Sequence, residues 1–196
     1  ANMLLAPPEL ADAHPPEELA RGVCAEPKPA AAGGRLDLGG GISAELLAPR
    51  MPLLRGTGDD ANANSVVLML SHGSVRMLLT GDIGEAAAIR LVRDVLNSGR
   101  SLRADVLLLP HHGRNLREVE VLLDAVRPRW AIASCDDDAQ HYLGDEEMAL
   151  LRERGIELLR TDEHGAVTVR SDGRRVSVDA ARGTRSLGQW VAAARR

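Results

Sequence analysis

The chain has 196 residues, of which 44% are hydrophobic and 27% are charged, and these proportions are ordinary for a globular protein. Its net charge of −4 excludes the overall basic character of a typical nucleic-acid-binding domain, and its two cysteines, Cys24 and Cys135, exclude a disulfide scaffold or a four-cysteine zinc module. Because no apolar run is long enough to cross a bilayer, we expect neither a membrane span nor a secretory signal peptide in these residues.

The first third of the chain predicts few regular elements. Residues 1–61 hold most of the prolines, together with three consecutive glycines at 39–41, and this leaves room only for short elements. We expect a short helix over residues 16–21 and a strand over residues 42–47. For residues 48–61, disorder is the alternative to an ordered loop.

From residue 64 onwards, apolar runs and turn residues predict a regular alternation of elements. The expected elements are a hairpin of strands 65–70 and 75–80, a helix over 83–97, a strand over 104–109, a helix over 116–126, a strand over 130–134, a helix over 145–154, a strand over 156–160, a hairpin of strands 167–170 and 175–178, and an amphipathic helix over 186–195. This order predicts an α/β fold, in which helices pack on a largely buried mixed sheet.

Polar clusters follow two of the predicted strands. Asp82 comes after Thr80-Gly81, and His111 and His112 come between Pro110 and Gly113. Ligands of α/β sheets bind at the carboxyl ends of strands, and carboxylate and imidazole groups suit zinc or manganese. The pattern therefore indicates a metal site. The structural alternatives are a helix cap for Asp82 and backbone hydrogen bonds for two turn histidines.

Two other polar stretches favour a structural interpretation. The aspartates at 136–138 predict a solvated acidic loop, because consecutive side chains do not converge on one ion. The arginines after residue 170 have the chemistry for phosphate contacts. The negative net charge and the scarcity of stacking aromatic residues favour an ordinary arginine-rich surface instead.

The clusters also occur in an order that resembles a known family. The matching segments are Asn-Ala-Asn-Ser-Val-Val-Leu at 62–68, Leu-Leu-Thr-Gly-Asp-Ile at 78–83, Ala-Asp-Val-Leu-Leu-Leu-Pro-His-His-Gly at 104–113, Ala-Val-Arg-Pro at 125–128 and residues 159–167. This series resembles the C-terminal metallo-β-lactamase-like domain of the ComEC-type competence proteins, which are bacterial DNA-uptake channels. The resemblance covers about residues 62–170, and more loosely residues 35–49.

The resemblance implies a four-layer αββα sandwich with two divalent metal ions, zinc or manganese, at one edge. Asp82 matches the aspartate that bridges the two ions in the family, and either His111 or His112 matches a further ligand. Arg114 and His141 are the residues expected to contact the substrate. Such a site would hydrolyse a phosphodiester bond of DNA during uptake, without a nucleotide cofactor. The expected partners are DNA and the membrane channel domain of the same parent protein, which makes the chain a soluble domain of a bacterial cell-membrane protein.

The sequence departs from the family at the principal metal-binding motif. The family's His-x-His-x-Asp-His precedes the Asn-Ser hairpin, whereas the only histidine before residue 72 is His14. We therefore expect a sandwich that is incomplete at its N-terminus or a site that has decayed, and a chain that is inactive by itself. One alternative is a non-catalytic remnant of the same fold that binds DNA or docks a partner. Another is a different hydrolase of the superfamily, such as a phosphorylcholine esterase or a lactonase.

This interpretation divides the chain into three parts. Residues 1–61 are expected to form a Pro- and Gly-rich N-terminal part with few short elements. Residues 62–180 would be the C-terminal part of a metallo-β-lactamase-like domain, and residues 181–196 a C-terminal amphipathic helix or tail.

Overall fold

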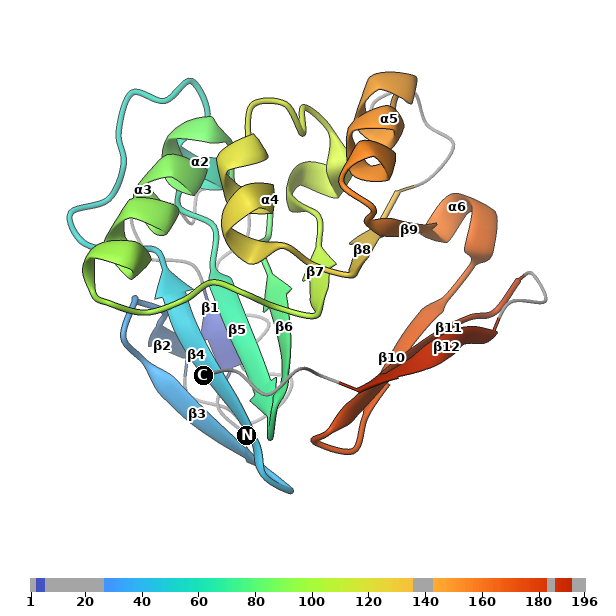
Figure 1. Cartoon of the computed structure of the whole chain (residues 1–196). Helices are drawn as coiled ribbons and strands as arrows, with labels where there is room; N and C mark the ends of the chain where they lie inside the picture. The colour runs from blue at the N-terminus through green and yellow to red at the C-terminus, as the bar shows by residue number, and fades with distance from the viewer. Residues whose placement is uncertain (1–2, 6–26, 136–142, 183–185, 192–196) are drawn as a thin grey trace.

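The computed structural model describes residues 3–5, 27–135, 143–182 and 186–191 (Figure 1). Its centre is a seven-stranded mixed sheet with the order β3-β4-β5-β6-β7-β8-β9. The strands are β3 (Arg35–Gly39), β4 (Ile42–Ala48), β5 (Val67–His72), β6 (Val75–Leu79), β7 (Val106–Leu108), β8 (Trp130–Ala133) and β9 (Glu157–Arg160). Neighbours from β3 to β6 are antiparallel, and those from β6 to β9 are parallel. The predicted α/β class with a mixed sheet is confirmed.

The helices of the described residues connect these strands. They are α2 (Asp60–Ala63), α3 (Glu85–Asn97), α4 (Glu120–Val126), α5 (Asp145–Glu153) and α6 (Thr161–His164). In Figure 1, α3, α4 and α5 lie together at the upper side of the molecule. None of the helices in the described part of the chain has both the length and the apolarity needed to cross a membrane.

The main core lies between the helices and one face of the sheet. In α3, buried apolar side chains recur at helical spacing and pack with Leu78 of β6 and Leu107 of β7 in one cluster. Val106, the neighbour of Leu107, points to the other face and belongs to a second cluster with Trp130. The continuous apolar runs of β7 and β8 therefore serve two cores, one on each face of the sheet.

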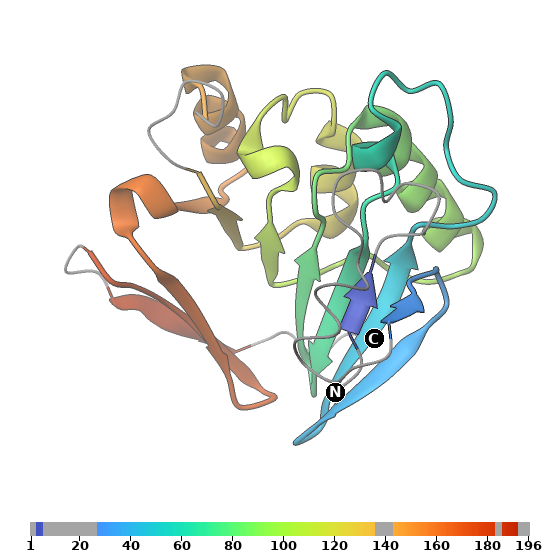
Figure 2. The same ribbon diagram turned by 180° about the vertical axis from the view of Figure 1, so that it is seen from behind.

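A second sheet forms the other side of that second cluster. It consists of β10 (Val167–Ser171), β11 (Arg175–Ala180) and β12 (Ser186–Val191), and its strands are antiparallel. Val176 and Val178 of β11 are fully buried in the cluster with Trp130. Figure 2 shows this sheet from behind, on the side away from α3 and α4. The two sheets and one helical layer are compatible with an α/β sandwich.

The tips of two hairpins join the sheets. The backbone N–H of Ser74 donates to the Gly173 carbonyl over 2.8 Å. A Cβ atom added to Gly73 would lie 2.2 Å from that same oxygen. Because Gly73 has a φ of +55°, this position needs glycine both for its backbone conformation and for the close approach of the second sheet.

The structure corrects the prediction at both ends of the chain. The helix expected over residues 186–195 is wrong for Ser186–Val191, which form β12. Pairing with β11 satisfies the backbone groups of an otherwise open sheet edge, and this outweighs a weak helical pattern in so short a segment. The unpredicted strands β1 (Met3–Leu5) and β2 (Pro27–Pro29) pair in parallel, and β3 adds a strand of the main sheet before residue 62. The helix expected over residues 16–21 lies outside the described residues.

Candidate functional site

The predicted site residues meet at the carboxyl ends of two neighbouring strands. Asp82 follows β6, and His111 and His112 follow β7 in a 3₁₀ turn over Pro110–Gly113. Since β6 and β7 are parallel neighbours, their ends lie at the same edge of the sheet. The Oδ1 atom of Asp82 lies 3.9 Å from Nε2 of His112. The structure thus brings together two of the side chains expected to share a metal ion.

Backbone and hydroxyl contacts fix the turn that carries Asp82. The buried hydroxyl of Thr80 donates to the carbonyl of Leu108 over 2.7 Å and so ties the end of β6 to the end of β7. The N–H of Asp82 donates to the hydroxyl of Ser65 over 3.3 Å. Gly81, with a φ of +54°, lies so close that an added Cβ would come within 3.0 Å of Ser65. The Gly-Asp turn is therefore packed against the first residues of the β5 segment.

The orientation of His112 is set by its second ring nitrogen. Nδ1 of His112 lies 2.7 Å from the carbonyl oxygen of Ser134, which only accepts hydrogen bonds. Nδ1 therefore donates this hydrogen bond, and Nε2 is the ring nitrogen on the side of Asp82. A histidine that donates one N–H to a backbone carbonyl in this way is typical of metal-binding sites.

The backbone of both histidines is strained. His111 has a φ of 50° and His112 a φ of 60°, so two consecutive side-chain-bearing residues adopt left-handed conformations. Such conformations cost about 1–3 kcal/mol each and gather at functional sites. Gly113, which ends this turn, packs so closely against Leu143 that an added Cβ would lie 2.4 Å from that side chain, so the position needs glycine.

His111 and Asp82 both line an open cavity of about 280 Å³. The wall of this cavity comes from the loop before α2, the start of α3 and the segment after the histidine turn. Its ionisable side chains are Asp59, Asp82, Glu85, His111 and Glu118. Four carboxylates around one cavity attract cations and repel free anions. Sequence reasoning missed Asp59, Glu85 and Glu118, because only the tertiary fold places them beside Asp82.

The loop that forms one wall of the cavity is held by Asn64. This side chain is buried and donates to the carbonyls of Leu54 and Asp60 over 2.9 and 2.7 Å. Its Oδ1 atom accepts the N–H of Leu54 over 2.9 Å. Asn64 therefore organises the loop, while the next residue, Ser65, holds Asp82. Neither role is predicted from the sequence, where the two residues enter only as part of the matching segment at 62–68.

The other predicted site residues do not join this pair within the described residues. Arg114 is half-buried just after the histidine turn and donates its N–H to the carbonyl of His111, and its side chain does not line the cavity. His141 and the aspartates at 136–138 lie outside the described residues. His164 is bonded through Nδ1 to the backbone of Arg160. Arg114 and His141 therefore remain predictions.

A second polar cluster near β8 has a structural character. Burial, reinforced by the hydrogen bond to Asp162, raises the pKa of the Cys135 thiol. Hydrogen bonds from Arg160 lower the pKa of Asp162. The thiol is thus held in its protonated form at neutral pH, which disfavours it as a nucleophile or metal ligand.

The donor groups at the candidate site are of the kinds that bind zinc or manganese. There are fewer of them than a catalytic metal ion generally has. A carboxylate and a neutral imidazole are suitable ligands, and catalytic zinc generally has three ligands from the protein. Within the part of the chain that the structure describes, no group of three His, Cys, Asp or Glu side chains is placed to hold one ion. Asp82 and His112 together offer two donor groups, one fewer than catalytic zinc generally has from the protein.

Comparison with known proteins supports the resemblance seen in the sequence. No model of a known protein family matches the chain. Competence protein ComA of Neisseria gonorrhoeae is 37% identical over 109 residues, which are 55% of this chain and 15% of that protein. ComE operon protein 3 of Bacillus subtilis is 30% identical over 132 residues, which are 66% of this chain and 16% of that protein.

A third relative, the uncharacterized protein YcaI of Escherichia coli, is 28% identical over 127 residues, which are 63% of this chain and 16% of that protein. The matched segments thus span 15–16% of the length of all three relatives. The chain is therefore related to one segment of bacterial competence proteins of the ComEC type.

Proposed function

We propose that this chain is part of a metallo-β-lactamase-like hydrolase domain of a competence protein, and that its site acts with divalent metal ions on phosphodiester bonds of DNA. The named relatives support the role in competence. The observation that carries the chemistry is the approach of Asp82 Oδ1 to His112 Nε2 at the end of two parallel strands. DNA and a membrane channel domain of the same parent protein are the partners in this proposal.

The proposed ligands are Asp82 and His112. A bound divalent ion polarises a phosphoryl oxygen and makes a bound water more acidic. Asp82 offers a carboxylate whose backbone is fixed by Ser65, and His112 offers Nε2 because Ser134 occupies Nδ1. His111 lines the cavity together with Asp82, but among the described residues its ring lacks a hydrogen bond like the one that orients His112. Of the two histidines that the sequence left open, the geometry therefore favours His112 as the ligand.

The acidic cavity beside the pair gives the site a dependence on cations. Asp59, Glu85 and Glu118 add negative charge next to Asp82 and would repel the phosphates of a nucleic acid. Divalent ions neutralise this charge. We therefore expect DNA to reach the site only when divalent cations are present.

Metal binding by the chain tests the ligand assignment. We expect Asp82→Ala and His112→Ala each to weaken zinc binding at least tenfold in isothermal titration calorimetry, since each removes one of few ligands. His111→Ala is the matched control, because it removes a histidine from the same turn. Its zinc affinity should stay within about threefold of the unmodified chain.

Hydrolysis of a single-stranded oligonucleotide in the presence of manganese tests the activity in the parent protein. Asp82→Ala should lower the rate at least ~100-fold, because a metal ligand is lost. An equal loss for His111→Ala and His112→Ala would contradict the assignment, and full activity in Asp82→Ala would remove the proposed function.

A non-catalytic DNA-binding or docking remnant is the second candidate. It is favoured by the count of two ligands in the described residues, where catalytic zinc generally has three. Metal analysis of the parent protein separates the two candidates. Two tightly bound equivalents that are lost in Asp82→Ala support the hydrolase, and none supports the remnant.

A further inference from the structure

Four neighbouring strands each contribute one group to a row at the same edge of the main sheet. The strands β6, β7, β8 and β9 are parallel, so their carboxyl ends lie side by side there. The groups that follow them, in the same order, are the side chain of Asp82, the side chain of His112, the peptide between Ser134 and Cys135, and the side chain of Thr161. The row therefore leads from the Asp82–His112 pair to Thr161, the first residue of α6.

The peptide between Ser134 and Cys135 is held from both of its sides. Its carbonyl oxygen, which belongs to Ser134, accepts the hydrogen bond from Nδ1 of His112 over 2.7 Å. Its N–H, which belongs to Cys135, donates to Oγ1 of Thr161 over 2.9 Å. Because the C=O and the N–H of one trans peptide lie in a rigid plane and point in opposite directions, the contact with Thr161 determines where the carbonyl points. Thr161 is thus connected to His112 through a single planar unit.

The paired part of β8 ends before this peptide. The register of β8 with β9 finishes with the pair Ala133 and Arg160. Beyond it, the hydroxyl of Thr161 accepts the N–H of Cys135 and also donates to the carbonyl of Cys135 over 2.6 Å. The position of this hydroxyl is well defined, because Thr161 lies between the ion-paired Arg160 and Asp162 and branching at Cβ restricts its rotation. One side chain therefore takes over the role of the sheet in fixing the end of β8.

The hydrogen bonds of this row strengthen one another. A peptide whose N–H donates a hydrogen bond is polarised, so its carbonyl oxygen accepts more strongly. The bond from Cys135 to Thr161 therefore strengthens the bond that His112 donates to Ser134. A histidine that donates one ring N–H in this way has a fixed ring orientation and a more basic second nitrogen. That second nitrogen is Nε2, which lies 3.9 Å from Oδ1 of Asp82.

We propose that Thr161 is a positioning residue of the candidate metal site and that it acts on His112 through the peptide between Ser134 and Cys135. It holds the ring so that Nε2 lies on the side of Asp82, and it thereby increases the affinity of that nitrogen for a metal ion. The first of these effects depends only on the hydrogen bonds of the chain. The second rests on the proposed function, in which His112 is a ligand.

Nuclear magnetic resonance of the metal-free chain tests the first effect. In the chain with isotope-labelled histidine rings, we expect the Nδ1–H proton of His112 as a downfield signal that exchanges slowly with water, and His112→Gln identifies this signal by removing it. Thr161→Val keeps the shape of the side chain and lacks the hydroxyl, so this proton should exchange about tenfold faster. Thr161→Ser keeps the hydroxyl, and its exchange rate should stay within about threefold of the unmodified chain.

Zinc binding in isothermal titration calorimetry tests the second effect. Thr161→Val should weaken zinc binding about tenfold, as does the loss of other groups that orient a metal-bound histidine. In the His112→Ala background the same substitution should change the affinity by less than about twofold, because Thr161 acts on the metal only through His112. Thr161→Ser should bind zinc within about threefold of the unmodified chain.

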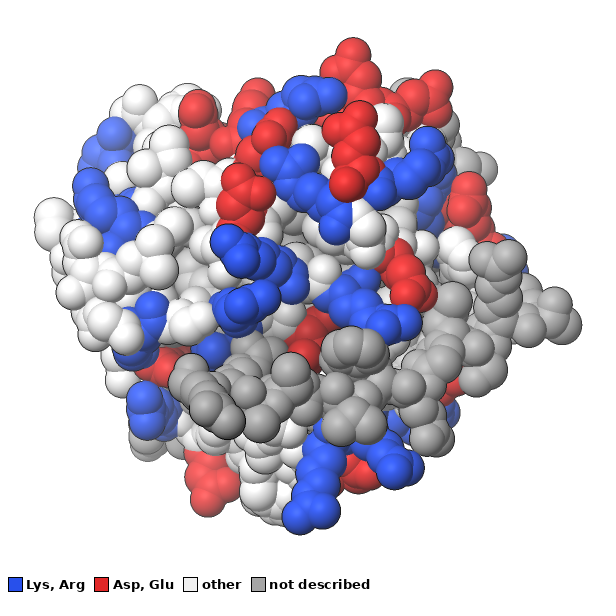
Figure 3. All heavy atoms as spheres, viewed as in Figure 1, with Lys and Arg blue, Asp and Glu red and all other residues white. Residues whose placement is uncertain are grey.

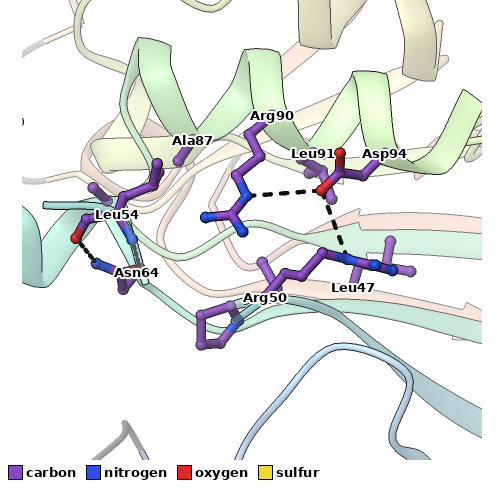
Figure 4. Close-up of a pocket in the computed structure, with 11 residues that line it drawn as sticks. Leu47, Arg50, Leu54, Asn64, Ala87, Arg90, Leu91 and Asp94 are labelled. Atoms are coloured by element: carbon purple, nitrogen blue, oxygen red, sulfur yellow. Dashed lines mark hydrogen bonds and ion pairs between the residues drawn. The ribbon is translucent and has the colours of Figure 1, made fainter. Parts of the chain in front are cut away.

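Asp94→Asn is the control for the loss of a polar contact elsewhere in the fold. Asp94 lies in α3, and its Oδ2 atom is 3.6 Å from Nε of Arg50 and 3.7 Å from Nε of Arg90 (Figure 4). These three residues line a small pocket between α3 and the end of β4, and neither His112 nor Thr161 lines it. Even where urea unfolding shows the same loss of stability as in Thr161→Val, the exchange rate of the His112 proton should stay within about twofold.

Glu120→Gln is the control for a change of surface charge. Glu120 forms ion pairs of 3.4 Å with Arg117 and 2.8 Å with Arg154, in the region of α4 and α5 where red and blue spheres lie side by side in Figure 3. Because surface ion pairs act weakly and are screened by salt, both the exchange rate and the zinc affinity should stay within about twofold.

Three results would overturn the proposal. They are an exchange rate that Thr161→Val leaves unchanged, an equal acceleration in Asp94→Asn, and an equal loss of zinc affinity on Thr161→Val with and without His112. Failure of the proposed function looks different. In that case Thr161→Val still accelerates the exchange of the His112 proton, which supports the positioning of the ring, while the zinc affinity of the chain does not depend on His112, which rejects the metal ligand.

Discussion

Replacing Arg160 with Met is expected to lower the free energy of unfolding by about 3–5 kcal/mol, because it leaves a buried carboxylate without its partner. Only 7% of the Arg160 side chain and 12% of the Asp162 side chain are exposed to solvent. Nε of Arg160 donates to Oδ1 of Asp162 over 3.1 Å, and Nη2 donates to Oδ2. Urea unfolding at neutral pH measures the loss. Arg152→Met, at an exposed position of α5, is the control and should change stability by less than about 0.5 kcal/mol.

The same pair determines in which direction stability changes when the pH is lowered. Arg160 lowers the pKa of Asp162 in the folded chain below its unfolded value of about 3.9. The contribution of Asp162 to stability is therefore fully present above pH 4 and is lost as the pH falls through the lowered folded pKa. Asp162→Asn should be less stable at neutral pH and should lose less stability than the unmodified chain on acidification below pH 4. Parallel pH profiles would contradict this account of the pair.

Replacing Gly73 with Ala is expected to have the second large effect, because it pushes the two sheets apart. The left-handed backbone costs Ala about 1–2 kcal/mol, and the contact with the backbone of Gly173 adds about 1–3 kcal/mol of overpacking. Backbone lies on both sides of the contact, so no flexible side chain can yield. The N–H of Ser74 would also lose its bond to Gly173.

Gly40→Ala is the matched control for this substitution. Gly40 has a φ of +62°, close to the +55° of Gly73, and an added Cβ there meets nothing within 4 Å. The control should therefore show only the cost of the left-handed backbone. Hydrogen exchange should be faster in β10 and β11 of Gly73→Ala and unchanged in Gly40→Ala. Equal destabilisation by the two substitutions would mean that the junction does not bind the sheets together.

The elements that the sequence predicted well are those with a strong internal pattern. The helical spacing of apolar residues in α3 and the continuous apolar runs of β7 and β8 correspond to burial in one core or in two. β3 and β12 lack such a pattern. Each is defined by pairing with a neighbouring strand, and pairing between segments is a property of the tertiary fold.

The candidate site could likewise be predicted only in part from the sequence. Asp82 and the two histidines follow strands, so their convergence could be expected from the parallel order of β6 and β7. The distinction between His111 and His112 depends on a carbonyl of Ser134, 22 residues further along the chain. The acidic side chains of the cavity come from three separate segments, and no local pattern relates them.

The hydrogen bonds of Asn64 relate the conformation of one loop to the binding of cations in the cavity. Asn64 is hydrogen-bonded to both ends of the segment Leu54–Asp60, and Thr57 and Asp59 of this segment line the cavity. A cation bound between Asp59 and the opposite wall of the cavity would restrain this segment. Cation binding can therefore be followed by the rate at which trypsin cuts after the exposed Arg55. Digestion should slow as manganese is added, and Asn64→Ala should accelerate it.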